Sequence, residues 1–147
     1  MSENVIRPFI PVVLAAFVIA CASGQPTSVQ QDSEAKMFTA PSDAGKGRVY
    51  VVRPAGFAGA AILTQIMVDG RIAAAVGPKN YFVLDLSAGD HIFAPLGQSK
   101  QQSLRLNVEP GKLYFIEVHH IAGTVTLLSD EEGRSLVRGS TRIEPTI

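Results

Sequence analysis

The residues that could do chemistry in this sequence are few and stand apart from one another. The three histidines are His91, His119 and His120. His119 and His120 are adjacent on an expected strand, where successive side chains point to opposite faces, so they are poorly placed to share one metal ion. His91 follows a turn and would need a long-range contact to join either of them. We therefore predict no metal site and no cofactor.

Motifs that bind phosphate or activate a nucleophile are not found in the sequence. Lys46 follows a glycine, as in a phosphate loop, but Ala40 stands where that loop needs glycine and no Ser or Thr follows the lysine. No G-x-G-x-x-G or G-x-S-x-G pattern occurs. Asp69 and Asp90 fall in expected turns, where short carboxylates bond to the local backbone. The sequence therefore predicts no catalytic residues and a protein that is not an enzyme.

Two arginines, Arg48 and Arg53, bracket the first expected strand. We interpret them as solvated strand ends, because arginine is rarely buried without a partner. The alternative is that they contact a small anion or a glycan.

The single cysteine, Cys21, ends an apolar N-terminal segment. Residues 9–20 carry no charge, and Arg7 precedes them. This arrangement is typical of a secretory signal peptide. The run is too short to cross a membrane comfortably, since a spanning helix needs about 20 apolar residues. A single cysteine cannot form an intrachain disulfide, so we infer the role of Cys21 from its position at the end of this segment.

The tetrapeptide Val18-Ile19-Ala20-Cys21 resembles the lipobox of bacterial lipoproteins. The resemblance implies cleavage between Ala20 and Cys21, lipidation of the Cys21 thiol, and acylation of the new amino group. Several acyl chains anchor a protein firmly, whereas one chain binds only marginally. In bacterial lipoproteins, an aspartate directly after the lipidated cysteine resembles a signal for retention in the inner membrane. Residue 22 is alanine, so the resemblance implies a location in the outer membrane, facing the periplasm. The alternative is an ordinary buried cysteine in an N-terminal helix.

The charge balance excludes one class of partner. The formal net charge is zero, and removing Arg7 and Glu3 leaves 12 basic and 12 acidic residues after Cys21. A neutral domain has no basic field to hold a phosphate backbone, so nucleic acid is not an expected partner.

The chain divides into three parts. Residues 1–20 are the expected signal peptide, and residues 21–45 are the lipidated N-terminus and a flexible tether. The tether is rich in polar residues, Gly and Pro, and cannot bury enough surface to offset its ordering entropy. About 20 such residues span on the order of 25 Å. Residues 46–147 form the expected folded domain.

Short apolar runs ended by turn signals recur along residues 46–147 and predict about seven to eight strands. Asp69-Gly70 is a hairpin signal, and residues 109–112 fit a type II turn. Because a half-solvated sheet must be covered, the pattern predicts an all-β fold, a small antiparallel β-sandwich. The expected strands are 48–53, 62–68, 71–76, 81–86, 91–96, 103–108, 113–119 and 124–128.

The alternation in two of these runs predicts core positions, and a short C-terminal helix follows the strands. Arg105 and Asn107 should be exposed. Ser129 with Glu132 forms a capping box, and Gly139 is a plausible end of the helix. The expected core residues are Leu84, Leu86, Leu104, Leu106 and Val108.

Turn residues and alternating apolar positions recur in a fixed order along the chain: Phe38, Pro41, Gly45 to Pro54, Val68 to Gly70, Tyr81, Phe82, Leu84, Gly89 to His91, Leu106, Val108, Gly111, Lys112 and Glu131 to Arg134. This order resembles the DUF2846 family of bacterial lipoproteins. The pattern is also similar to PEGA-like and transthyretin-like sandwiches. The resemblance implies a lipid-anchored β-sandwich and supplies no catalytic residues.

Three functions remain open at this point. The first is a non-enzymatic envelope protein whose sandwich binds a protein partner, with the membrane contacted through the lipid on Cys21. The second is a glycan or peptidoglycan binder, which needs exposed aromatic rings; Tyr50, Tyr81 and Tyr114 all fall within expected strands. The third is an enzyme, which no motif supports.

Overall fold

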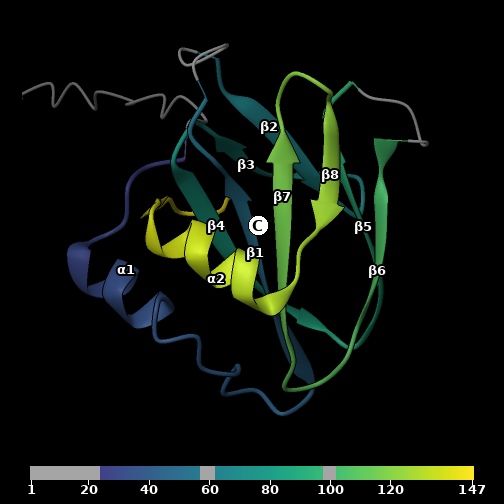
Figure 1. The fold of residues 1–147 in the computed structure, drawn as a ribbon. Coiled ribbons are helices and arrows are strands. Elements are labelled where there is room, and N and C mark those ends of the chain that lie inside the picture. Colours follow the sequence, from purple (N-terminus) through teal and green to yellow (C-terminus); the bar gives the residue numbers. More distant parts are fainter. Residues whose placement is uncertain (1–23, 57–61, 98–101) are drawn as a thin grey trace, which may run out of the picture.

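Two β-sheets lie face to face, and two helices cover the outer face of one of them (Figure 1). The computed structural model describes residues 24–56, 62–97 and 102–147. The elements in these ranges are α1 (Val29–Ala35), β1 (Lys46–Arg53), β2 (Thr64–Val68), β3 (Arg71–Val76), β4 (Asn80–Ser87), β5 (Gly89–Pro95), β6 (Leu104–Val108), β7 (Leu113–His119), β8 (Thr124–Leu127), α2 (Asp130–Arg138) and β9 (Thr141–Arg142).

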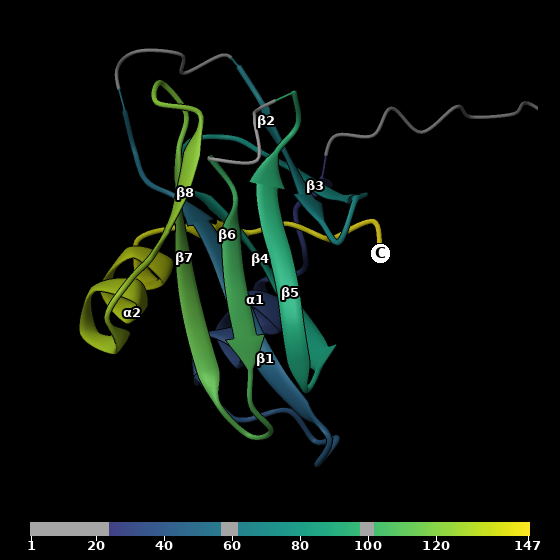
Figure 2. The ribbon, with the colours of Figure 1, turned by 90° about the vertical axis from the view of Figure 1, so that its right-hand side faces the viewer.

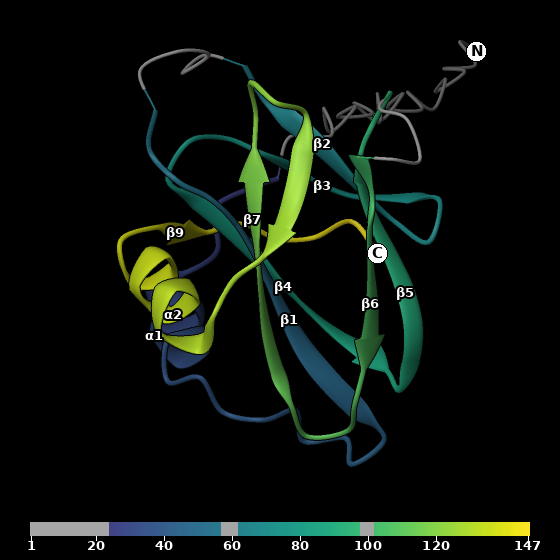
Figure 3. The ribbon, with the colours of Figure 1, turned by 45° about the vertical axis from the view of Figure 1, so that its right-hand side comes forward.

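The larger sheet has the strand order β8-β7-β1-β4-β9, and the smaller has β3-β2-β5-β6. Figure 3 shows the helices on one side of β1 and β7, with β5 and β6 on the other. The predicted all-β sandwich with a C-terminal helix is confirmed. Two pairings, β1 with β7 and β4 with β9, are parallel, whereas the sequence predicted antiparallel strands alone. Parallel neighbours need long connections, and here the chain forms all four strands of the second sheet, and β4, between β1 and β7.

Strand β1 is buried on both faces, which explains its nearly continuous apolar run. Val49 and Val51 contribute to the core between the sheets. Tyr50 and Val52 point the other way, into a second cluster under the helices.

The core positions predicted from alternation are confirmed, although two of them are only half-buried. Leu84, Leu106 and Val108 are buried, and Arg105 and Asn107 are exposed. The two other predicted core residues are half-buried and pack against the same cluster: Leu86 and Leu104.

Helix α2 begins and ends as the sequence predicts. The Glu132 amide donates to the Ser129 hydroxyl, and the Glu132 carboxylate accepts from the Ser129 amide. The helix meets the sheet at Gly133, where an added Cβ would stand 2.1 Å from Cγ of Phe115. Val137, one turn later, is fully buried. The missing side chain at Gly133 therefore allows the close approach of helix and sheet.

The segment before β1 differs most from the prediction. Residues 21–45 were expected to form a flexible tether, but α1 lies within them and begins with its own capping box, formed by Ser28 and Gln31. Phe38, just after the helix, is buried and its ring lies 5.5 Å from that of Tyr50. The prediction was wrong for this stretch because its few apolar side chains complete a cluster built by residues far along the chain.

Polar contacts fix the same segment to the larger sheet. The hydroxyl of Tyr81 donates to the Asp32 carboxylate at 2.8 Å, and that of Tyr50 donates to the Ala35 carbonyl at 2.8 Å. The amide of Arg142 also donates to the Asp32 carboxylate at 2.9 Å. Residues 28–38 are therefore part of the folded domain.

The first described residues pair with the end of the chain. The Thr27 amide donates to the Arg142 carbonyl at 3.1 Å, and the Glu144 amide donates to the Gln25 carbonyl at 2.9 Å. From there the C-terminal tail crosses to the smaller sheet, where the Thr146 amide donates to a carbonyl of β3 (Figure 2). The described part of the chain thus starts in contact with the fold at residue 24.

The predicted signal peptide (residues 1–20), the cleavage site after Ala20 and the lipidated Cys21 lie outside the described residues. None of the helices in the described part is both long and apolar enough to cross a membrane.

Candidate functional site

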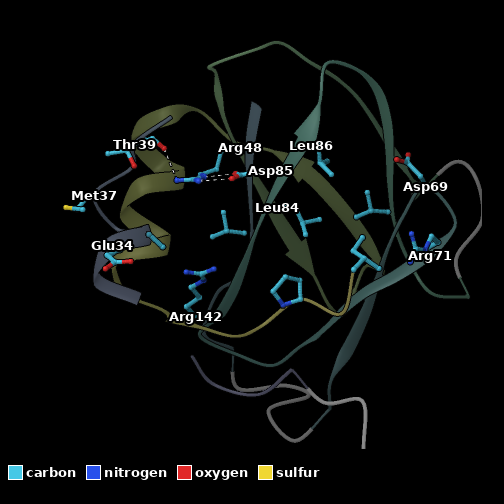
Figure 4. A pocket seen from close by; sticks show the side chains of 15 residues that line it. Glu34, Met37, Thr39, Arg48, Asp69, Arg71, Leu84, Asp85, Leu86 and Arg142 are labelled. Carbon is cyan, nitrogen blue, oxygen red and sulfur yellow. Dashed lines mark hydrogen bonds and ion pairs between the residues drawn. The ribbon is translucent and has the colours of Figure 1, made fainter. Parts of the chain in front are cut away.

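A groove of about 740 Å³ runs beside the edge strand β4 (Figure 4). Its volume lies in the range of roughly 300–1,000 Å³ that is common for ligand sites. The floor is the β4 edge, and the two walls are the α1 segment and the β2–β3 hairpin. The lining residues are Glu34, Ala35, Met37 and Thr39 on one wall, Val68, Asp69 and Arg71 on the other, Val83 to Leu86 on the floor, and Arg142, Pro145 and Ile147 at one end.

The groove exists because β9 covers only the beginning of β4. Strand β9 pairs with Asn80 and Tyr81, and the Tyr81 carbonyl accepts from the Ile143 amide at 2.8 Å. Backbone groups alternate along a strand, so those of Val83 and Asp85 also point away from β1. Among the described residues, no hydrogen bond to these backbone groups is found. The β4 edge is therefore open at these two residues.

A two-pronged ion pair crosses the groove floor. Nε and Nη2 of Arg48 donate to the two carboxylate oxygens of Asp85 at 2.7 and 2.8 Å. Nη1 of Arg48 donates to the Thr39 carbonyl at 3.0 Å. The hydrogen bonds to Asp85 raise the pKa of Arg48 above its usual value. Arg48 thus ties β1, β4 and the N-terminal segment together and is no solvated strand end.

A second pair, Asp69 with His91, closes the other wall. Nδ1 of His91 lies 2.6 Å from the Asp69 carboxylate, and Nε2 lies 2.8 Å from the Ser87 carbonyl. Both ring nitrogens face acceptors, which favours the protonated ring. Burial opposes the charge, but these hydrogen bonds outweigh it, and the pKa of His91 is raised.

The carboxylate of Asp69 also holds the smaller sheet together. It accepts from the Ile92 amide at 2.8 Å, so it joins the β2–β3 turn to β5. Burial raises its pKa, but the hydrogen bonds from Ile92 and His91 outweigh burial, and the net pKa is lowered. The sequence predicted only local backbone bonding for this residue, and that prediction was wrong because the turn packs against another strand.

The other two histidines lie elsewhere and have separate partners. Nδ1 of His119 is 3.5 Å from the Glu117 carboxylate, and Nδ1 of His120 is 2.9 Å from the Thr64 hydroxyl. In the part of the chain that the structure describes, no group of three His, Cys, Asp or Glu side chains is placed to hold a metal ion.

Two more polar residues have roles that the sequence did not indicate. Arg53 is buried, and its guanidinium donates to the Val76 carbonyl at 3.2 Å; burial lowers its pKa. Its interpretation as a solvated strand end was wrong. Asp90 lies in β5 and accepts from Asn107 of β6 at 2.8 Å, so it too bonds across strands.

Sequence reasoning missed two arginines that line the groove, Arg71 on one wall and Arg142 at one end. Arg142 donates from Nη1 to the Gln31 carbonyl at 3.1 Å, while its buried Nε has no hydrogen-bond partner among the described residues. Arg71 is exposed on β3, and within the described ranges no ion pair forms on it. No local pattern marks Arg142, because only the pairing of β9 with β4 brings it to the groove.

Comparison with known proteins places the fold in a family. The model of the family described as Protein of unknown function (DUF2846) matches residues 43–130, more than half of the chain. The chain belongs to the DUF2846 family. Searches of curated proteins and of solved structures found no match. The groove floor lies within the DUF2846 match, whereas Glu34, Met37 and Arg142 lie outside it.

Proposed function

We propose that this DUF2846 chain is a lipid-anchored protein of the bacterial outer membrane, facing the periplasm, and that its sandwich is a non-enzymatic interaction module. The lipobox-like tetrapeptide ending at Cys21 and the apolar run before it support the anchor. The groove beside β4 supports the binding role.

The observation that carries the binding role is the groove of about 740 Å³, whose floor is the open backbone edge of β4 at Val83 and Asp85. The pKa of Arg48 is raised and that of Asp69 is lowered, so both stay charged throughout the neutral range. A general acid or base works best with a pKa near the working pH. Arg48 and Asp69 are therefore poor general acids or bases, and their ion pairs with Asp85 and His91 instead hold the groove walls in place.

The position of Gly24 shortens the distance between membrane and domain that the expected tether of residues 21–45 would allow. Cys21 stands three residues before Gly24, which is the first described residue. An extended residue spans at most about 3.6 Å, so the lipidated residue lies within about 11 Å of the fold. A domain anchored in this way works beside the bilayer and does not reach out on a long tether.

The buried tyrosines favour a protein partner over a glycan. Tyr50 and Tyr81 are fully buried under the helices. Tyr114 is half-buried and packs against the main core. Sugar rings are usually bound on exposed aromatic faces, and the three tyrosines do not offer one.

Replacing Cys21 tests the anchor. Cys21→Ser should leave an uncleaved or soluble precursor, because a serine hydroxyl does not accept lipid by this route. Fractionation and mass spectrometry of the N-terminus measure the result. A variant that loses its signal completely and still partitions into detergent would contradict the lipoprotein assignment.

Site-specific photo-crosslinking in the native envelope tests the binding role. A crosslinking residue at Met37, on the groove rim, should capture a protein in cells that carry the lipidated chain. The same residue at Thr126, which is exposed on β8, is the matched control. Equal capture from both positions, or none from Met37, would contradict a binding site in the groove.

A further inference from the structure

The open part of β4 has the geometry of a docking site for another strand. The amides and carbonyls of Val83 and Asp85 point out of the sheet with no partner among the described residues. The edge is closed on one side by β9 at Tyr81 and on the other by His91 at the Ser87 carbonyl. An extended peptide carries matching donors and acceptors at the same spacing, so a short strand can complete the ladder between these two stops.

The walls of the groove restrict what can reach this edge. Met37 and Glu34 stand on one side and Arg71 stands on the other. A second copy of the chain would present a β4 edge recessed behind the same walls, and the two edges could not approach to the roughly 4.8 Å that strand pairing needs. A bare extended segment has no such walls, so the groove fits a peptide better than a second copy.

The charges that remain unpaired in the groove select the chemistry of the segment. Asp85 and Asp69 are already bonded to Arg48 and His91. Among the lining side chains, that leaves two cations, Arg71 and Arg142, against one carboxylate, Glu34. The guanidinium of Arg142 is half-buried beside the groove and forms no ion pair with the other described residues. A partly desolvated cation of this kind favours an incoming carboxylate.

The floor of the groove offers apolar contacts as well. Figure 4 shows Leu84 on the floor between Arg142 and Arg71. Leu86 and Val68 line the same groove. Along an extended peptide, side chains alternate between the two faces, so apolar residues can meet these contacts while an acidic residue reaches an arginine.

We propose that the groove binds an extended segment of a partner protein, which adds as a strand to Val83 and Asp85 of β4 and places a carboxylate beside Arg142 or, at the opposite wall, beside Arg71. This inference rests on the proposed binding role and adds the mode of binding and the partner's chemistry.

A peptide probe tests the mode of binding. The full lipidated chain is placed in phospholipid nanodiscs and titrated with a fluorescent nonapeptide that alternates threonine with valine and carries one glutamate. The same peptide with N-methyl groups on alternate amides should not bind, because it cannot donate to the β4 carbonyls. The same peptide with lysine in place of glutamate should bind about tenfold more weakly, a difference of 1.4 kcal/mol.

A proline at the open edge distinguishes strand addition from non-specific binding of the peptide. Val83→Pro removes an amide that points away from β1, so it keeps the β1 ladder and should weaken the glutamate peptide about tenfold or more. Val83→Ala loses similar side-chain packing but keeps the amide and should bind as the native chain does. Leu127→Pro, on the outer edge of β8, controls for a proline in any edge strand. Thermal melts show that each variant is folded.

The arginines are tested by charge. Arg71→Gln and Arg142→Gln should each reduce the preference for the glutamate over the lysine peptide, while binding of an uncharged peptide persists. Equal binding of the N-methylated peptide, or native binding by folded Val83→Pro, would overturn the proposal. Self-association that Val83→Pro abolishes, or capture of anionic vesicles that the peptide does not displace, would assign the groove to a second copy or a lipid instead. If Met37 crosslinks to a protein but the peptide does not bind, strand addition is contradicted and the proposed binding role is not.

Discussion

The two helices lie on the same face of the larger sheet but are held there differently. Both begin with a capping box, at Ser28 in α1 and at Ser129 in α2. Helix α2 is held by close packing, through Gly133 and the buried Val137. Helix α1 buries only Ala35 in the cluster under the helices, and most of its contacts with other elements are polar, above all those of Asp32. The comparison shows that the same local signal predicts where a helix begins but not what binds it to the fold.

Adding a side chain between α2 and the sheet should lower the free energy of unfolding more than removing the polar contacts of α1. Gly133→Ala places a Cβ 2.1 Å from Phe115, and overpacking of this kind costs up to about 3 kcal/mol, more than the roughly 1 kcal/mol that alanine gains in a helix. Ser135→Ala, at an exposed position in the same helix, should change the free energy of unfolding little. Urea melts measure both. A Gly133→Ala variant as stable as the native chain would show that the helix moves away from the sheet at little cost.

Removing the polar contacts of α1 should have an intermediate effect. Asp32→Ala deletes the acceptor for Tyr81, Arg142 and Lys36, which costs about 2 kcal/mol because it leaves partly buried donors unpaired. Ser33→Ala, one residue further along, is the exposed control. Limited proteolysis should cut the α1 segment faster only in Asp32→Ala. Unchanged cleavage would mean that Phe38 alone holds the segment.

The same residue gives α1 an acid dependence. Burial raises the pKa of Asp32, but the hydrogen bonds from Lys36, Tyr81 and Arg142 outweigh burial, and the net pKa is lowered. The stabilisation is therefore present above the unfolded pKa, near 3.8, and is lost as the pH falls through the lowered folded value. The difference in unfolding free energy between the native chain and Asp32→Ala should shrink on acidification below that range. A constant difference would contradict the ionised role of Asp32.

The smallest effect is expected from His91, which bonds to Asp69 of the groove wall. Its pKa is raised in the fold, so its contribution is present below the unfolded value of about 6.5 and is lost as the pH rises through the folded value. Because its Asp69 partner is half-exposed, the contribution should stay below about 1 kcal/mol. Melts of the native chain and His91→Gln should therefore converge as the pH rises above neutrality. Asp69→Asn should abolish the same dependence, and a difference that grows with pH would contradict the charged pair.

Local patterns in the sequence determined the sandwich, its main turns and the C-terminal helix. The hairpin at Asp69 and Gly70 follows from backbone angles that those residues accept, and both have positive φ. The burial of Leu106 and Val108 follows from strand alternation. The start of α2 follows from a contact between residues three apart. Each of these features depends on neighbours along the chain, so the sequence alone contains the physical reason for it.

Tertiary structure alone decided the position of α1 and the shape of the groove. The Asp32 carboxylate meets the Arg142 amide across 110 positions of the chain, and no local pattern encodes such a contact. The edge of β4 is open at Val83 because β9 pairs with only the first two residues of that strand. Arg142 reaches the groove through the same pairing. The candidate site is therefore set by the docking of distant segments, whose energetics depend on surfaces that exist only once both sheets have formed.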